Sequence, residues 1–315
     1  MDKRQLGRSD LRIAPLMLGG NVFGWNVDEA SSFALLDAFV DAGFNAVDTA
    51  NSYSRWVPGH KGGESETVIG NWLKKSGKRS KVVIATKVGS DMGRGKTVRK
   101  DAILREAEAS LKRLQVDCID LYQTHFDDEV TPVEETLSAY AQLVEQGKVR
   151  VVGASNISPA RLKQSLEASR KLGIPRYESL QPNYNLADRR KFESEYEPIC
   201  REHKLGVITY YSLAGGFLTG KYRSKADAEK SESRGDKVKG YFDARGLRIL
   251  TALDAVSKRH NATPAQVSLA WLIARPGITA PIASATNRKQ LDDIMQAPRL
   301  KLSTDDIAAL DKASG

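Results

Sequence analysis

Eight short apolar runs alternate with amphipathic helical stretches along the 315-residue chain, and this alternation restricts the possible folds more than any other feature. Strand-like runs separated by helices are typical of α/β proteins with parallel sheets. The candidate strands are residues 15–18, 44–48, 82–86, 118–123, 149–154, 178–181, 206–210 and 278–282. Because no linker or change in composition interrupts the pattern, it favours a single domain over residues 1–315 that forms a closed (β/α)8 TIM barrel. An open doubly wound sheet is the alternative.

Local signals add detail at the ends of these elements. Residues 30–42 carry apolar side chains at helical spacing, and Gly43 is the expected C-cap of that helix. Thr131 is the expected N-cap of another helix, with Pro132 in its first turn. Ahead of the first strand, residues 6–13 have two β-prone arms around a Gly/Ser/Asp turn. This pattern predicts an N-terminal β-hairpin.

One segment departs from the alternation. Residues 214–245 are polar and rich in Lys, Ser, Asp and Gly, and they are too many for an ordinary connection between a strand and a helix. Long connections of this kind often cover functional sites. We therefore expect residues 214–245 to form a covering loop.

Charge and composition argue against several classes of protein. The net charge is +9, but the basic residues are spread along the chain and are not interleaved with aromatic ones, so no nucleic-acid partner is expected. A basic surface also suits an anionic cofactor. Cys118 and Cys200 have no C-x-x-C partner and are expected to be reduced, buried thiols. No apolar run is long enough to span a membrane and no signal segment is visible, so we expect a cytoplasmic protein.

Familiar cofactor and metal motifs are missing from the sequence. Residues 93–97 imitate the end of a phosphate-binding P-loop, but the required upstream glycine is out of register by one position. No G-x-G-x-x-G follows the first strands, and no H-E-x-x-H or tight His/Cys cluster occurs. The sequence therefore predicts neither a Rossmann-type cofactor site nor a metal site.

Polar residues stand where three consecutive strands end. Asp48, Lys87 and His125 end the second, third and fourth candidate strands, and Tyr53 lies on the loop after Asp48. In a barrel, the C-terminal ends of all strands face one mouth. Taken singly, each residue has an ordinary explanation as a turn cap, a solvated lysine, a rim histidine or loop packing. Together, the four predict a site for proton transfer.

Each of the four residue types has a distinct part in such a site. The Lys87 ammonium is expected to lower the pKa of the Tyr53 phenol, which is otherwise a poor acid at neutral pH. Asp48 is expected to keep the buried Lys87 charged and oriented. His125 is expected to donate a hydrogen bond to the oxygen of the reacting group.

The segments that carry these residues also resemble a known family. The four residues lie within 45–53, 86–87 and 123–125, and further matching segments are 62–66, 152–156, 181–185 and 218–222. In this order and context, they resemble the catalytic tetrad and the cofactor motifs of aldo-keto reductases over nearly the whole chain. The resemblance implies that the chain reduces an aldehyde or ketone to an alcohol with NADPH, or NADH, as hydride donor. Tyr53 would then be the general acid.

The resemblance implies a cofactor site as well. Ser155, Asn156 and Gln181 would bind the nicotinamide carboxamide, and Tyr210 would stack under its ring. Residues 212–216, which include Ser212, Leu213 and Gly216, would contact the pyrophosphate. The residues that would hold the adenosine end with its 2′-phosphate are Ser284, Thr286, Arg288, Gln290 and Asp293, and Gly20 and Asn21 are also assigned to the cofactor. Because an arginine can clamp a phosphate through two charge-assisted hydrogen bonds, Arg288 is expected to favour NADPH over NADH by about tenfold.

The chain departs from the family pattern in its substrate pocket. Asn21 stands where relatives often have a tryptophan, and Tyr211 and Ser212 follow Tyr210 where many have Ser-Pro. The lost tryptophan would form an aromatic wall. Trp25, Trp56 and Phe126 are candidates to replace it, with ordinary loop packing as the alternative for each residue.

Two other functions stay open at this point. The resemblance extends to ion-channel β-subunits, so the chain could be a regulatory subunit or sensor that binds nicotinamide nucleotide with little turnover. An unrelated barrel enzyme is the second alternative, a lyase or isomerase that uses Lys87 to form a Schiff base.

Overall fold

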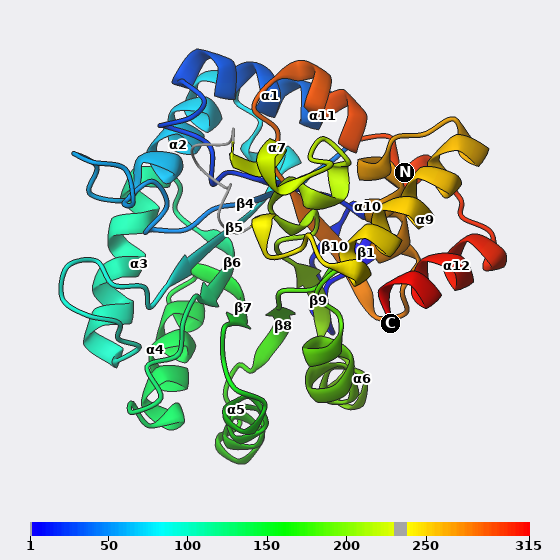
Figure 1. Ribbon diagram of the computed structural model, residues 1–315. Helices are drawn as coiled ribbons and strands as arrows, with labels where there is room; N and C mark the ends of the chain where they lie inside the picture. Colours follow the sequence, from blue (N-terminus) through cyan, green and yellow to red (C-terminus); the bar gives the residue numbers. More distant parts are fainter. Residues whose placement is uncertain (1, 230–237) are drawn as a thin grey trace.

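The computed structural model describes residues 2–229 and 238–315, and its centre is a closed barrel of eight parallel strands (Figure 1). The barrel strands are β3 (Met17–Gly19), β4 (Ala46–Asp48), β5 (Val83–Val88), β6 (Ile119–Thr124), β7 (Val149–Ser155), β8 (Tyr177–Gln181), β9 (Gly206–Thr209) and β10 (Ile278–Ala283). Neighbouring strands follow the order of the sequence, and β10 closes the ring between β9 and β3. The predicted (β/α)8 barrel is therefore confirmed, and each predicted strand ends within two residues of its observed bounds.

Helices surround the barrel and connect its strands (Figure 1). They are α1 (Glu29–Asp41), α2 (Glu64–Ser76), α3 (Lys100–Leu114), α4 (Val133–Glu145), α5 (Pro159–Leu172), α6 (Glu197–His203), α7 (Lys225–Glu229), α9 (Ala244–His260), α10 (Pro264–Ala274), α11 (Arg288–Ile294) and α12 (Thr304–Ser314). Shorter turns are η1 (Arg79–Lys81), η2 (Phe192–Tyr196, a π-helix), η3 (Ala214–Thr219) and η4 (Ala297–Arg299). Within the described part of the chain, none of these helices has the length and apolar character needed to cross a membrane.

The predicted hairpin closes the N-terminal end of the barrel. Strands β1 (Arg4–Gln5) and β2 (Arg12–Ile13) pair antiparallel, and Leu6, Leu11 and Ile13 pack against side chains inside the barrel. Contact with the barrel is close, because a Cβ atom at Gly206 would lie 2.6 Å from Leu6 Cδ1. The hairpin therefore covers the end of the barrel opposite the mouth.

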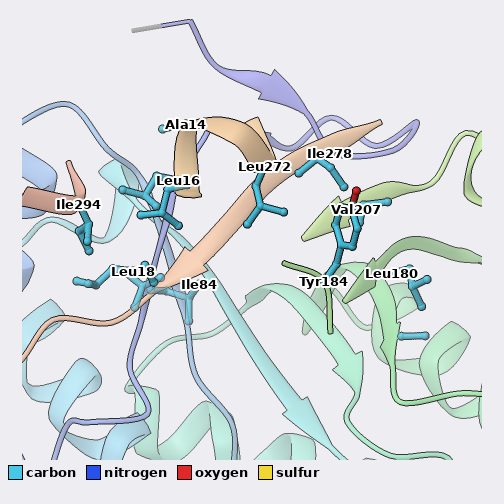
Figure 2. Close-up of a cluster of buried hydrophobic side chains, with 14 of the residues drawn as sticks. Ala14, Leu16, Leu18, Ile84, Leu180, Tyr184, Val207, Leu272, Ile278 and Ile294 are labelled. Carbon is cyan, nitrogen blue, oxygen red and sulfur yellow. The ribbon is translucent and has the colours of Figure 1, made fainter. Parts of the chain in front are cut away.

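Strand side chains divide between two apolar layers, since successive residues of a strand point to opposite faces. Val83 and Ala85 belong to the layer inside the barrel, whereas Ile84, between them, belongs to the layer shared with the helices. Figure 2 shows part of this outer layer, in which Leu18 and Ile84 lie with side chains of α10 and α11. The outer layer is the larger of the two and holds the helices against the barrel.

Some local predictions need correction. Helix α1 ends one residue before its C-cap Ala42, so that Gly43 follows the cap with φ +92°. Pro132, not Thr131, is the N-cap of α4, because the Thr131 hydroxyl donates instead to Asp128 Oδ2 at 2.6 Å. The predicted covering loop is partly helical, since residues 214–245 contain η3, α7 and the start of α9. Residues 230–237 of that segment lie outside the described residues.

Candidate active site

The alternation of side chains along the strands brings the predicted tetrad into the barrel mouth. In β4, Ala46 faces the barrel interior, so Asp48, two residues later, faces it too. In β5, the same reasoning applies to Ala85 and Lys87. His125 follows directly after β6, and its backbone N–H donates to the Val88 carbonyl at the end of β5. The three polar side chains therefore meet at the C-terminal ends of adjacent strands.

Lys87 is the centre of the hydrogen-bond network. Its ammonium donates to Asp48 Oδ2 at 2.7 Å, to the Thr49 carbonyl at 2.7 Å and to the Tyr53 hydroxyl at 3.0 Å. The Tyr53 hydroxyl in turn donates to Asp48 Oδ2 at 3.2 Å. The Lys87 side chain is 0% exposed, so this ammonium depends on the adjacent carboxylate for charge compensation. Asp48, Tyr53 and Lys87 therefore form one connected unit.

The electrostatics of the phenol differ from the expectation. Burial raises the pKa of Tyr53 well above its ordinary value, and the Asp48 carboxylate raises it further. Burial also lowers the pKa of Lys87, against the opposing effect of Asp48. The predicted lowering of the phenol pKa is therefore not found, because burial, followed by the Asp48 carboxylate, raises it. The consequence is a phenol that keeps its proton at neutral pH, as a proton donor must.

His125 completes the group. Its ring centroid lies 6.0 Å from that of Tyr53, and its Nδ1 atom lies 2.8 Å from Ser90 Oγ and 3.5 Å from Ser52 Oγ. Burial lowers the pKa of the imidazole well below its ordinary value, and the Lys87 ammonium lowers it further. His125 is therefore neutral at pH 7 and carries a single ring proton.

Residues assigned to the nicotinamide lie beside this group. Tyr210 donates its hydroxyl hydrogen to Asn156 Oδ1 at 2.9 Å, and Asn156 Nδ2 donates to the His125 carbonyl at 2.8 Å. Ser155 Oγ donates to the Gln181 carbonyl at 2.8 Å, which ties the ends of β7 and β8 together. The predicted carboxamide-binding residues and Tyr210 thus belong to one hydrogen-bonded cluster at the mouth.

Gln181 has a contact that its predicted role did not include. Its Nε2 donates to Asp48 Oδ1 at 2.9 Å, and it lies 3.4 Å from Gln123 Oε1. Because a carboxylate only accepts hydrogen bonds, the amide nitrogen of Gln181 must face Asp48. This leaves the Gln181 amide oxygen as the atom for a further donor.

The backbone after β9 makes a tight turn that includes the predicted pyrophosphate segment. Tyr211, Ala214, Gly215 and Gly216 all have left-handed φ values, of +55°, +49°, +67° and +104°. Ser212 is buried and donates to the Thr209 carbonyl at 3.0 Å. Leu213 is half-buried and directly precedes η3. Gly215 and Gly216 adopt these φ values at little cost because they have no Cβ atom, and this makes the turn possible.

The ends of β3 and β10 join on the other side of the mouth. Ser284 Oγ hydrogen-bonds to Asn21 Oδ1, and the Gly20 backbone N–H donates to the Asp48 carbonyl at 2.7 Å. Gly19 is also tightly packed, since a Cβ atom there would lie 2.5 Å from Ser284 Oγ. Gly20, Asn21 and Ser284 therefore lie together, next to the backbone of Asp48.

The residues assigned to the adenosine end of the cofactor lie in α11 and just before it. The Thr286 N–H and hydroxyl donate to Gln290 Oε1 at 2.9 and 3.0 Å, and Arg288 Nε donates to Asp292 Oδ1 at 2.8 Å. Asp293 points to the start of α10, where it accepts hydrogen bonds from Thr263 and Gln266.

Aromatic side chains that were predicted to contact the substrate lie beside two members of the tetrad, Tyr53 and His125. Trp25 and Trp56 lie edge to face with centroids 5.9 Å apart, and Trp56 lies 6.0 Å from Tyr53. Phe126 stacks on His125 at 4.7 Å. Trp56 is 54% exposed, which is unusual for a large apolar side chain that serves only for packing.

Sequence reasoning missed Ser52 and Ser90, the two hydroxyls beside His125 Nδ1. Ser90 follows Lys87 by three residues, but a serine in a loop carries no signal that separates it from an ordinary turn residue. Only the fold shows that the loop after β5 turns back toward His125.

Other parts of the described chain are weaker candidates. One cavity of about 380 Å³ lies at the N-terminal end of the barrel and is lined by Lys3, Arg79, Asp120 and others, whose charges are largely paired. Another of about 510 Å³ lies beside the N-terminus of α2. Neither is lined by the tetrad, and the described residues hold no cluster of metal-binding side chains. The barrel mouth, where the tetrad lies, is therefore the candidate active site.

Comparisons with known proteins show which family the chain belongs to. The model of the aldo/keto reductase family matches residues 15–314. The oxidoreductase YrpG of Bacillus subtilis is 35% identical over 96% of this chain and 92% of its own length. Protein Tas of Escherichia coli is 31% identical over 99% of this chain and 97% of its own. A probable voltage-gated potassium channel subunit beta of Oryza sativa subsp. japonica is 32% identical over 94% and 91%. The chain therefore belongs to the aldo/keto reductase family and is an NAD(P)H-dependent oxidoreductase.

Proposed function

We propose that the chain reduces a small aldehyde or ketone to an alcohol, with NADPH as cofactor and Tyr53 as the general acid. The observation that carries this proposal is the buried unit of Asp48, Lys87 and Tyr53, in which one carboxylate and one ammonium compensate each other. The phenol beside them keeps its proton. It can therefore donate that proton to a carbonyl oxygen as the carbon is reduced.

The residues of the mouth suit a nicotinamide nucleotide by the chemistry of their donors and acceptors. Ser155, Asn156 and the amide oxygen of Gln181 offer hydrogen-bonding groups of the kind a carboxamide needs. Tyr210 offers a ring beside them, and the turn at Gly215 and Gly216 lets backbone approach a pyrophosphate closely. When bound there, the nucleotide supplies the hydride.

The 2′-phosphate would lie at α11 in this proposal. Arg288 is 68% exposed and pairs only with Asp292 in the next turn of the same helix. A surface pair of this kind contributes about 1 kcal/mol or less, so a phosphate can compete for the guanidinium at small cost. Thr286, Gln290 and the neighbouring residues of the segment would contact the same end of the cofactor. This supports a preference for NADPH over NADH.

His125 and the aromatic side chains would bind the substrate. A neutral imidazole beside Tyr53 can donate one hydrogen bond to the carbonyl oxygen and so polarise it. Trp25, Trp56 and Phe126 would form an apolar wall for the rest of the molecule. Such a wall favours a carbonyl compound with an apolar or aromatic portion.

Tyr53→Phe tests the general acid. We expect turnover to fall by about 10²–10⁴-fold, because the ring is kept and only the proton donor is lost. NADPH oxidation would be measured with a panel of aldehydes and ketones, and cofactor binding by nucleotide fluorescence. Binding should stay near that of the wild type, because Lys87 and Asp48 keep their direct contact of 2.7 Å. Wild-type turnover in this variant would remove Tyr53 from the mechanism.

A regulatory subunit that binds the nucleotide with little turnover is the second candidate. The similarity to a potassium channel subunit beta favours it. The complete tetrad argues for an enzyme. The same panel separates the two, since a sensor would bind NADPH tightly and yet oxidise it no faster with any carbonyl compound than without one.

A further inference from the structure

The role proposed for His125 places a requirement on its ring proton. A neutral imidazole has one N–H group and one nitrogen that accepts. Nδ1 lies against Ser90, whereas no hydrogen bond to Nε2 occurs among residues 2–229 and 238–315, so Nε2 is the nitrogen left for a substrate. A carbonyl oxygen only accepts hydrogen bonds, so the proton must be on Nε2 and Nδ1 must accept.

Ser90 is held at Nδ1 by the backbone on both sides of it. Gly89, directly after β5, has φ +105°, and a Cβ atom there would lie 2.7 Å from the Phe126 carbonyl oxygen. Only glycine permits this close turn, which directs the next residue toward His125. After Ser90, the Asp91 carbonyl accepts a hydrogen bond from Arg55 Nη1 at 2.6 Å.

His125 is held by the same part of the backbone, at the end of β5. The His125 N–H donates to the Val88 carbonyl at 2.7 Å, and Phe126 stacks on the imidazole at 4.7 Å. Among the described residues, His125 Nδ1 is the one hydrogen-bond partner found for the Ser90 hydroxyl. Ser90 and His125 are therefore fixed relative to each other before any substrate arrives.

We propose that Ser90 is a positioning residue that donates its hydroxyl hydrogen to Nδ1 and so holds His125 in the Nε2-protonated tautomer. This inference rests on the proposed reductase function, because it names the group that prepares His125 for the carbonyl oxygen. Of the two possible directions of the Ser90 hydrogen bond, this one leaves a donor toward the substrate. The opposite direction would turn a lone pair of Nε2 toward the lone pairs of the carbonyl oxygen.

Ser52 is the natural control for this assignment. Its hydroxyl lies 3.5 Å from the same Nδ1 atom, at the limit of a hydrogen bond, whereas Ser90 lies at 2.8 Å. A hydrogen bond weakens steeply at such a distance. Ser90→Ala and Ser52→Ala therefore each remove one hydroxyl from beside the same ring nitrogen, with different expected results.

The tautomer can be read directly by ¹⁵N NMR of the full-length protein labelled at histidine. The chain has four histidines, and the His125 signal is identified by its loss in His125→Gln. We expect a protonated Nε2 and a hydrogen-bonded, unprotonated Nδ1 in the wild type at pH 7.5. Ser90→Ala should shift the Nδ1 resonance to that of a free acceptor, Ser90→Thr should restore it, and Ser52→Ala should leave it unchanged. A protonated Nδ1 in the wild type would overturn the proposal, as would an unchanged Nδ1 in Ser90→Ala.

Kinetics add a second test. Ser90→Ala should lower kcat about five- to tenfold, the effect of one net hydrogen bond, with the KM for NADPH unchanged and activity restored in Ser90→Thr. Wild-type kcat in Ser90→Ala would contradict the positioning role. Because the NMR measurement needs no turnover, a wild type that reduces none of the carbonyl panel would refute the proposed function and leave the tautomer assignment measurable by itself.

Discussion

Replacement of Lys87 by methionine would test whether the buried ion pair is the element on which the site depends. Methionine keeps the length of the side chain and much of its apolar contact, but it removes the ammonium. Three hydrogen bonds are lost, to Asp48 Oδ2, the Thr49 carbonyl and the Tyr53 hydroxyl. We expect both the stability of the fold and the rate of reduction to fall.

The size of the loss in stability follows from the hydrogen bonds that Asp48 keeps in the variant. In Lys87→Met, the carboxylate still accepts from Gln181 Nε2 at 2.9 Å and from the Tyr53 hydroxyl at 3.2 Å, but its charge has no adjacent cation. Removal of one partner from a buried pair costs about 3–5 kcal/mol. We therefore expect the free energy of unfolding to fall by about 3 kcal/mol, the lower end of that range, because two neutral donors remain. Replacement of both partners should cost less than the sum of the single changes.

Urea unfolding of the wild type, Lys87→Met, Asp48→Asn and the double variant measures this coupling. Asp48→Asn is the matched partner, since it removes the charge and keeps the shape. The double variant should recover about 1–3 kcal/mol relative to the sum of the two single variants. Strict additivity of the two changes would refute the reasoning, because it would mean that the charges do not compensate each other. NADPH oxidation in Lys87→Met should fall in parallel.

Two further variants probe the cofactor end and the pH dependence. Arg288→Ala should raise the KM for NADPH about tenfold and hardly change that for NADH in steady-state assays; equal weakening of both would argue against a phosphate clamp. His125→Gln tests how the protonation of this imidazole changes the stability of the fold with pH. Because burial lowers the His125 pKa, the unfolded chain binds more protons than the folded one between that pKa and about 6.5, so stability should fall as the pH drops through this window. The slope is at most about 1.4 kcal/mol per pH unit for this one group. Urea unfolding at several pH values should show a shallower slope in His125→Gln, and parallel curves would contradict the assigned shift.

The barrel and the position of the tetrad could be predicted from the sequence because both depend on simple periodicities. Alternation of strands and helices indicates the barrel, and the two-residue period of a strand places Asp48 and Lys87 on the same inner face as Ala46 and Ala85. Neither inference needs the details of side-chain packing.

Two features of the site could not be predicted from the sequence. One depends on a backbone turn, and the other on the burial and neighbours of the phenol. The turn at Gly89 that brings Ser90 to His125 has no counterpart in hydrophobic periodicity. Likewise, the pKa of Tyr53 depends first on the burial of the phenol and then on the adjacent Asp48 carboxylate. The sequence predicted that Asp48 would pair with Lys87, and the contact of 2.7 Å agrees with this, but it gave no measure of how far the phenol is buried.

The distribution of charge around Asp48 bears on how the site meets a carbonyl group. The Asp48 carboxylate accepts hydrogen bonds from Lys87, Tyr53 and Gln181, which come from different parts of the chain. All three donors stabilise its negative charge. With Asp48 and Lys87 compensating each other, Tyr53 and His125 face the mouth as neutral groups. Each has a proton to donate, and a carbonyl oxygen has only lone pairs to accept it. In the proposed reduction, the carboxylate would compensate the buried ammonium, so that two neutral donors meet the carbonyl oxygen without a net charge that would have to be desolvated when the substrate binds.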